Sequence, residues 1–213
     1  MEIRKYGTES ASIVLLEPIG DFDPARTEYE LIKRYTSKDF QLITVTVDDW
    51  NRDLSPWNAP AVFGKEDFGD GASALLRKML PLCEDPGKTY ILGGYSLAGL
   101  FALWAACRTD VFRGVAAASP SVWFPGFTQY VREHELKSKA VYLSLGDREE
   151  KTKNKTMSTV GERIREIYGL LKERGVSCTL EWNPGNHFQE ADVRIAKAFA
   201  WVMERVNKNG GRN

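Results

Sequence analysis

The chain has 213 residues, of which 43% are hydrophobic and 27% charged, a composition typical of a globular protein with a substantial core. Lys and Arg total 29 and Asp and Glu total 29, so the basic excess of a nucleic-acid-binding or membrane-surface protein is missing. No apolar stretch approaches the ~20 residues that span a bilayer, and the N-terminal MEIRKYGTES lacks the apolar core of a signal peptide. We therefore expect a cytoplasmic protein with a single domain, residues 1–213, and neither nucleic-acid nor membrane partners.

Cysteine and histidine are scarce. Cys83, Cys107 and Cys178 are odd in number and far apart, which predicts buried free thiols rather than disulfides. The only histidines are His134 and His187, and no Cys/His cluster has the short spacing of a zinc site. We expect no metal site and no cofactor.

Short apolar or β-branched runs alternate with segments of helical periodicity along the chain. Continuous apolar runs are typical of strands that are covered on both faces. The runs that predict strands are Ser12–Leu16, Gln41–Val47, Thr89–Leu92, Gly114–Ala118, Ala140–Leu145 and Val176–Trp182. The segments that predict helices are Arg26–Tyr35, Ala72–Leu80, Leu97–Cys107, Thr159–Arg174 and Val193–Val206.

This alternation predicts an α/β protein with a mostly parallel, doubly wound sheet, helices on both faces, and a minimal lid domain or none. The segment Asp48–Gly71 follows neither period and is predicted to be a long ordered loop, since such loops are often functional and this one carries two tryptophans. The terminal KNGGRN is expected to fray.

The strongest chemical signal is the string YILGGYSLAGL, which runs from a predicted strand into a predicted helix. Ser96 lies between Gly94 and Ala98, with Gly99 next. Small neighbours suit a serine held on a sharp, strained strand-to-helix turn that lifts its hydroxyl above the sheet. The bland alternative is an ordinary Gly/Ser turn, but the strand before and the helix after favour Ser96 as a nucleophile.

A nucleophilic serine needs a base. His187 lies in NPGNHF, after the predicted strand Val176–Trp182 and before the last helix, which is where this arrangement presents its histidine. His134 lies in the charged segment REHELKSK, which we interpret as an exposed helix. We therefore predict His187 as the base and His134 as a surface residue.

The third member of such a site is a carboxylate that orients the imidazole. In the order Ser, acid, His, it follows the strand Ala140–Leu145, where Asp147, Glu149 and Glu150 compete. We favour Glu149, and the other two remain alternatives.

Two backbone N–H groups are expected to bind the oxyanion. The Leu97 amide begins a helix directly after the nucleophile. The second donor should come from the loop after Ser12–Leu16, where Pro18 has no N–H, so the choice lies between Ile19 and Gly20. We choose Ile19.

Three segments carry a family resemblance: GGYSLAGLFALWA, AAASPSVWF and SLGDREEKTKN. Together they resemble the esterase family of α/β-hydrolases that includes enterobactin-esterase-like and esterase-D-like enzymes. The likeness implies the α/β-hydrolase fold, places Ser96, Glu149 and His187 at the triad positions, and puts Trp123 near the substrate pocket. Among the aromatic residues of the loops, we expect Trp57 to line the pocket as well.

These residues together predict a serine esterase that cleaves a small-molecule ester through an acyl-enzyme. Two alternatives remain open: an acyltransferase that uses the same site with an alcohol acceptor, and a catalytically silent binding domain. Alcohol acceptors and a fluorophosphonate probe would separate the three.

Overall fold

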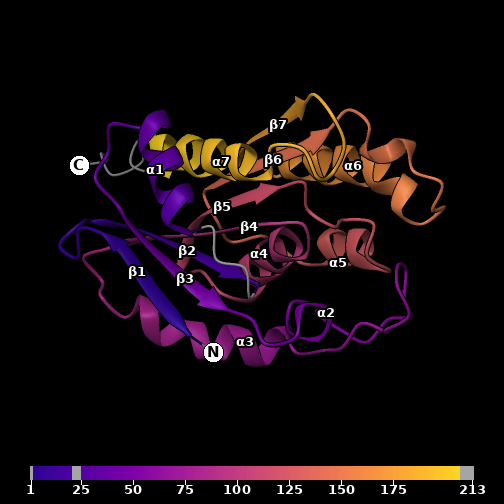
Figure 1. Cartoon of the computed structure of the whole chain (residues 1–213), viewed down its shortest axis with the longest axis horizontal. Coiled ribbons are helices and arrows are strands. Elements are labelled where there is room, and N and C mark those ends of the chain that lie inside the picture. Colours follow the sequence, from indigo (N-terminus) through magenta and orange to yellow (C-terminus); the bar gives the residue numbers. More distant parts are fainter. Residues whose placement is uncertain (1, 21–24, 207–213) are drawn as a thin grey trace.

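The structure, a computed structural model, describes residues 2–20 and 25–206; the KNGGRN segment lies outside them. Strands and helices alternate along the chain (Figure 1). The strands are β1 (Ile3–Gly7), β2 (Ile13–Ile19), β3 (Gln41–Thr46), β4 (Thr89–Tyr95), β5 (Phe112–Ala118), β6 (Ala140–Gly146) and β7 (Ser177–Asn183). The α-helices are α1 (Ala25–Tyr35), α2 (Trp50–Asp53), α3 (Ala72–Met79), α4 (Leu97–Arg108), α5 (Phe127–Glu133), α6 (Val160–Glu173) and α7 (Ala191–Val206).

All the strands belong to one seven-stranded sheet of order β1-β3-β2-β4-β5-β6-β7. β1 pairs antiparallel with β3, and every other neighbouring pair is parallel. From β2 the chain steps outward to β3, and it then returns to build the other half from β4 onward. The order therefore reverses between β2 and β4, and the carboxyl ends of strands at such a point border a natural crevice.

Helices cover both faces of the sheet, as predicted, and two separate apolar cores result. On one face, α1 and α7 lie against each other (Figure 1). Apolar side chains of α1 and α7 pack there with side chains of β2, β4 and β6. On the other face, α3, α4 and α6 pack on the alternate side chains of the same strands. Strands covered in this way have buried residues on both sides, which explains their continuous apolar runs.

Two glycines let α7 approach the centre of the sheet. A Cβ on Gly93 of β4 would lie 2.4 Å from the ring of Phe199, and one on Gly114 of β5 would lie 2.2 Å from Val202. Both contacts are far shorter than van der Waals distance, so any side chain there would push the helix away. The position of α7 matters because the loop before it carries His187.

The structure differs from the predicted elements in a few places. β1 was not predicted, and β2 continues to Ile19, so Glu17 to Ile19 form strand rather than loop. The segment 48–71 is ordered, with the helix α2 and an antiparallel bridge between Ala59 and Phe68. The exposed helix predicted around His134 is only partly right, because Arg132 and Glu133 end α5 and the chain is not helical from His134 onward. The ring of His134 stacks on Tyr130 with centroids 4.0 Å apart.

The three cysteines are free, and Cys107 is buried. Burial raises the pKa of Cys83 and Cys107 to about 12, so these thiols stay protonated at neutral pH. None of the helices in the described part of the chain combines the length and hydropathy needed to span a bilayer.

Candidate active site

Ser96 joins the end of β4 to the start of α4 with a strained backbone. Its φ of 59° and ψ of −121° lie outside the regions that L-residues favour. Hydrogen bonds on both sides hold this turn: the Ser96 amide donates to the Ala118 carbonyl at 3.2 Å, and its carbonyl accepts from the amides of Leu100 at 3.1 Å and Ser121 at 3.0 Å. The surrounding structure therefore fixes the strained backbone conformation of Ser96.

The turn has no room for larger neighbours. A Cβ on Gly94 would lie 2.5 Å from the Cβ of Ala98, and one on Gly99 would lie 2.9 Å from the Gly94 carbonyl oxygen. Strand and helix thus meet at backbone contact on either side of the serine, and this is the steric reason for the small residues in GGYSLAG.

His187 reaches Ser96 from the loop between β7 and α7. Its Nε2 lies 3.1 Å from the Ser96 Oγ, and its Nδ1 lies 2.7 Å from Oε2 of Glu149. Because a carboxylate can only accept, Nδ1 carries the hydrogen and Nε2 is left to accept from the serine hydroxyl. The hydroxyl of Tyr95 donates to the His187 carbonyl at 2.7 Å and so fixes the backbone of the histidine.

Glu149 lies in a 3₁₀ turn (Glu149–Lys151) just after β6, with its side chain 4% exposed. Its Oε1 accepts from the Gly146 amide and the Ser119 hydroxyl, each at 2.7 Å, while Oε2 faces His187. Burial alone would raise the pKa of Glu149. The hydrogen bond and charge of His187, with the Gly146 and Ser119 donors, outweigh burial and hold this pKa below its ordinary value.

The two competing carboxylates point elsewhere. Asp147 accepts from the Gly185 amide at 2.8 Å, and Glu150 pairs with Arg165 of α6 at 3.1 Å. Of the three acids after β6, the structure brings Glu149 to the imidazole.

Two residues behind Glu149 were not predicted. Arg194 of α7 is 1% exposed, and its Nη1 lies 3.0 Å from Glu149 Oε1 and 3.1 Å from the Ser119 Oγ. Ser119 itself has a positive φ of 43°. A sequence signal existed for the arginine, since Arg194 precedes Ala198 by four residues and Val202 by eight. It therefore occupies the apolar stripe of the helix, where an arginine requires a partner.

The predicted oxyanion donors come from two different elements, α4 and β2. Leu97 is the first residue of α4, where a backbone N–H has no partner within the helix. Ile19 is the last residue of β2; it pairs with Thr46 in the ladder, and its carbonyl accepts from Val47 at 2.8 Å. Gly20, the alternative to Ile19, is the first residue beyond the strand.

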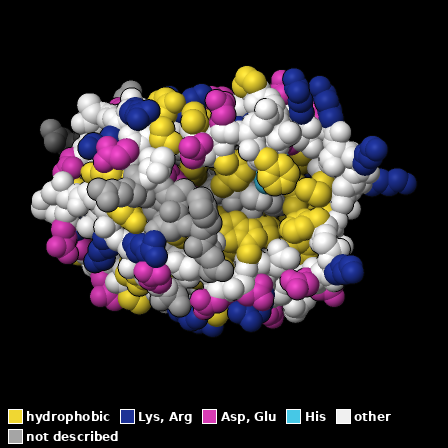
Figure 2. Space-filling model, in the orientation of Figure 1, with side chains coloured by type: hydrophobic (Ala, Val, Ile, Leu, Met, Phe, Trp, Pro, Cys, Tyr) yellow, Lys and Arg dark blue, Asp and Glu magenta, His cyan; other side chains and the backbone are white. Residues whose placement is uncertain are grey.

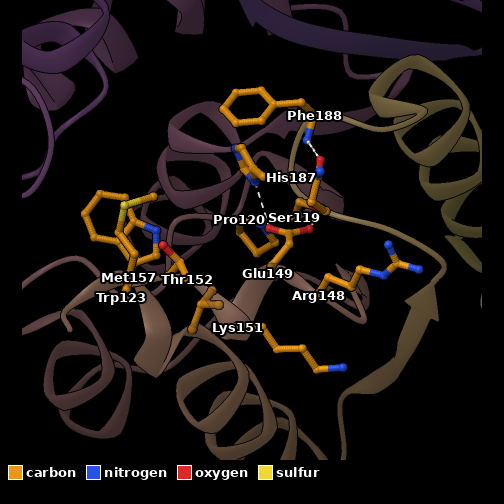
Figure 3. Close-up of a pocket in the computed structure, with 12 residues that line it drawn as sticks. Ser119, Pro120, Trp123, Arg148, Glu149, Lys151, Thr152, Met157, His187 and Phe188 are labelled. Carbon is orange, nitrogen blue, oxygen red and sulfur yellow. Dashed lines mark hydrogen bonds and ion pairs between the residues drawn. The ribbon is translucent and has the colours of Figure 1, made fainter. Parts of the chain in front are cut away.

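A cavity of about 290 Å³ opens beside His187. Figure 2 shows a hollow bordered by hydrophobic side chains with a histidine visible inside it. In Figure 3, Trp123 and Met157 lie across the cavity from Phe188, while Lys151 extends away from His187. Phe188 is 89% exposed and forms the outer rim. The cavity is therefore largely apolar and open to solvent.

The structure brings one of the two predicted pocket tryptophans to this cavity. Trp123 lines it, whereas Trp57 does not. The Trp57 indole N–H donates to the Pro125 carbonyl at 2.9 Å, and its ring packs against Phe124 and Tyr130. Trp57 thus supports the loop behind Trp123.

A second cavity of about 440 Å³ lies on the other side of Phe188, bordered by Gly20, Trp50 and Tyr95. Glu17 also lines it, and burial followed by the nearby carboxylate of Glu28 raises the pKa of Glu17. Among the described residues, no group of three or more His, Cys, Asp or Glu side chains is placed to hold a metal ion.

Comparison with known proteins agrees with this architecture. No family model matches the chain. The uncharacterized protein YbbA of Bacillus subtilis is 23% identical over 184 residues, which cover 76% of this chain and 73% of that protein. The siderophore hydrolase EstA of Aspergillus nidulans is 21% identical with a TM-score of 0.65, over 96% of this chain and 86% of EstA. An IroE-like serine hydrolase from Shewanella oneidensis is 15% identical with a TM-score of 0.73, over 95% of this chain and 75% of the other.

The chain has the α/β-hydrolase fold. The resemblance to enterobactin-esterase-like proteins, first visible in the sequence, is confirmed at the level of that fold. In an α/β-hydrolase fold the nucleophile, acid and histidine occur in that chain order. Ser96, Glu149 and His187 follow it, on the turn after β4 and the loops after β6 and β7.

Proposed function

We propose that the protein is a serine esterase that hydrolyses a small-molecule carboxylic ester. One observation carries the proposal: Ser96 Oγ lies 3.1 Å from His187 Nε2, and His187 Nδ1 lies 2.7 Å from a buried, ionised Glu149. A hydroxyl that contacts an imidazole, which in turn contacts a carboxylate, is the arrangement that acyl transfer through a serine requires. Two proteins that share the fold are named a siderophore hydrolase and a serine hydrolase, which supports the same reaction class.

In the proposed mechanism the Ser96 oxygen attacks the ester carbonyl carbon, and its proton passes to His187 Nε2. The carbonyl oxygen becomes an oxyanion that the Leu97 N–H stabilises, together with a second donor at Ile19 or Gly20. When the C–O bond to the alcohol breaks, His187 returns the proton to the leaving oxygen. Water then attacks the acyl-enzyme with His187 again as base, which releases the carboxylic acid and restores the Ser96 hydroxyl.

Glu149 acts on the imidazole rather than on the substrate. Its Oε2 fixes the tautomer in which Nε2 is free to accept, and its negative charge stabilises the imidazolium that forms in both steps. Trp123 and Met157 form the apolar wall against which part of the ester packs.

The test is hydrolysis of p-nitrophenyl esters of graded chain length, with intact-mass detection of the acyl-enzyme. We expect release of p-nitrophenol and a transient acyl adduct on the wild-type protein, and neither on Ser96→Ala. Transfer of the acyl group to added alcohol instead of water would favour an acyltransferase. Complete inactivity of folded protein towards every ester would favour a silent binding domain. The cytoplasmic location stays a prediction from the sequence.

A further inference from the structure

Arg194 connects the two loops that supply the acid and the base. Its Nη1 lies 3.0 Å from Glu149 Oε1, on the loop after β6. Its Nη2 donates to the carbonyls of Pro184 at 3.0 Å and Asn186 at 3.1 Å, which flank the start of the loop that carries His187. One rigid guanidinium thus holds both sides of the contact between Glu149 and His187.

Tyr95 extends this connection to the sheet. Arg194 Nη1 lies 3.2 Å from the Tyr95 hydroxyl oxygen, and that hydroxyl donates to the His187 carbonyl at 2.7 Å. Burial raises the pKa of Tyr95, so the hydroxyl keeps its proton and remains a donor. Because Tyr95 directly precedes Ser96, the same bonds relate the histidine loop to the nucleophile.

The guanidinium also carries charge. It is 1% exposed, so water screens it poorly, and it lies against the carboxylate that faces the imidazole. A positive charge at that position opposes the gain of a second positive charge on His187. Arg194 therefore has an electrostatic effect as well as a geometric one.

We propose that Arg194 is a positioning residue: its guanidinium holds Glu149 and the His187 loop in register, and its buried charge acts on the contact between them. This inference rests on the proposed function, in which His187 is the base.

The other charged and titratable groups near the pair are accounted for. From the loop after β6, Asp147 bonds the Gly185 amide and Glu150 pairs with Arg165 of α6. The remaining neighbours line the two cavities rather than bonding Glu149: Arg148 and Lys151 beside the first, and Glu17, Glu28, Glu190 and Asp192 beside the second. Arg194 is the cation that contacts Glu149 among the described residues.

The experiment measures the rate at which a fluorophosphonate probe labels Ser96 as a function of pH, so that no knowledge of the natural substrate is needed. Arg194→Gln removes the positive charge. Arg194→Lys keeps the charge but has only one nitrogen, so it cannot contact Glu149 and the Pro184 and Asn186 carbonyls as Nη1 and Nη2 do. Arg205→Gln is the matched control on the same helix. The Arg205 guanidinium is engaged with Trp201 instead of the site: its Cζ lies 3.7 Å from the Trp201 ring centroid, and its Nη1 donates to the Trp201 carbonyl.

For Arg194→Gln we expect a fall of about 10- to 100-fold in the maximal labelling rate. We also expect the acid limb of the profile, the pH range in which labelling is lost on acidification, to move to higher pH, because a nearby positive charge has been removed. A misplaced imidazole lowers the rate, and an imidazole that protonates more readily moves the limb. Arg194→Lys should lower the rate but leave the limb where the wild type has it. Arg205→Gln should match the wild type in both.

A folded Arg194→Gln variant, verified by circular dichroism, with a wild-type profile would overturn the inference. So would an Arg194→Lys variant whose limb shifts as far as that of Arg194→Gln. If Arg194→Gln does not fold, Tyr95→Phe tests the connection to the histidine loop. We expect a lower labelling rate for Tyr95→Phe, with the acid limb of the pH profile at the wild-type position. An unchanged labelling rate would contradict the inference. Failure of the proposed function differs from all of these, because wild-type protein would then not be labelled at Ser96.

Discussion

The turn that carries Ser96 and the junction that joins His187, Glu149 and Arg194 are built in opposite ways. The turn is local: a few consecutive residues, with Gly94 and Ala98 in backbone contact, determine its shape. The junction is assembled from four separate segments: the end of β4, the loop after β6, the loop after β7 and the first turn of α7. The shape of the turn is determined by adjacent residues, whereas the geometry of the junction depends on how the whole chain folds.

This difference has an energetic side. The turn stores backbone strain at a positive φ, held in place by the hydrogen bonds of its neighbours. The junction instead buries two opposite charges, and a buried ion pair is costly to break because the remaining partner is left without compensation. Changes to the turn should therefore act through sterics and chemistry, and changes to the junction through charge and orientation.

The largest expected effect follows from removing the nucleophile. Ser96→Ala should lower ester hydrolysis on the order of 10⁶-fold while the protein stays folded. Ser121→Ala is the matched control, because the Ser121 hydroxyl lies 3.2 Å from that of Ser96, whereas His187 Nε2 contacts the Ser96 hydroxyl. Steady-state rates with a p-nitrophenyl ester measure the effect of both substitutions. A greater loss of rate for Ser121→Ala than for Ser96→Ala would show that Ser96 is not the nucleophile.

The acid should give the next effect. Glu149→Gln keeps the shape of the side chain but removes the charge that orients and stabilises His187, so we expect kcat to fall about 10³- to 10⁴-fold. Asp147→Asn serves as the control, since its carboxylate bonds a backbone amide rather than the imidazole. Equal losses for the two variants would contradict the assignment of Glu149.

The turn can be broken without touching any reacting atom. Gly94→Ala introduces a Cβ 2.5 Å from that of Ala98, which should lower the free energy of unfolding by about 1–3 kcal/mol as β4 and α4 separate. Gly169→Ala is the opposite case, because Gly169 lies within α6 and a Cβ added there would have no atom of another residue within 4 Å. This substitution should raise the free energy of unfolding by about 0.5–1 kcal/mol. Urea unfolding measures both variants. If Gly94→Ala raised the free energy of unfolding as Gly169→Ala does, the contact at Gly94 would not constrain the turn.

The smallest effect is a pH dependence of stability at the junction. The folded-state pKa of Glu149 is depressed, so its contribution is present above the ordinary Glu value of about 4.3 and is lost as pH falls through the lower folded value. The difference in unfolding free energy between wild type and Glu149→Gln should therefore be largest near neutral pH and shrink below about pH 4. A difference that stays constant to pH 3 would argue against an ionised Glu149 in the folded protein.

Sequence reasoning recovered what adjacent residues encode. The interior strands and the long helices followed from apolar periodicity, and the turn at Ser96 followed from GGYSLAG. β1 was missed because IRKYG lies at an edge of the sheet, where mostly exposed residues give no apolar run. The short helices α2 and α5 were missed because one or two turns carry too little periodicity.

The junction was predicted only in part, for the same physical reason. Glu149 and His187 could be selected because each follows a recognisable strand. Arg194 and Tyr95 act through contacts 45 and 92 residues away in the chain, to Glu149 and His187 respectively, and no local pattern records such pairings. Trp57 could not be separated from Trp123 from the sequence, because both are aromatic residues in loops and only packing distinguishes them.

The most direct measurement is to identify the residue that a fluorophosphonate modifies, by peptide mass spectrometry of the labelled protein. We predict a single adduct on Ser96 that is lost in Ser96→Ala and strongly reduced in His187→Ala. An adduct on Ser121, or labelling of Ser96 that persists at full rate without His187, would contradict the account.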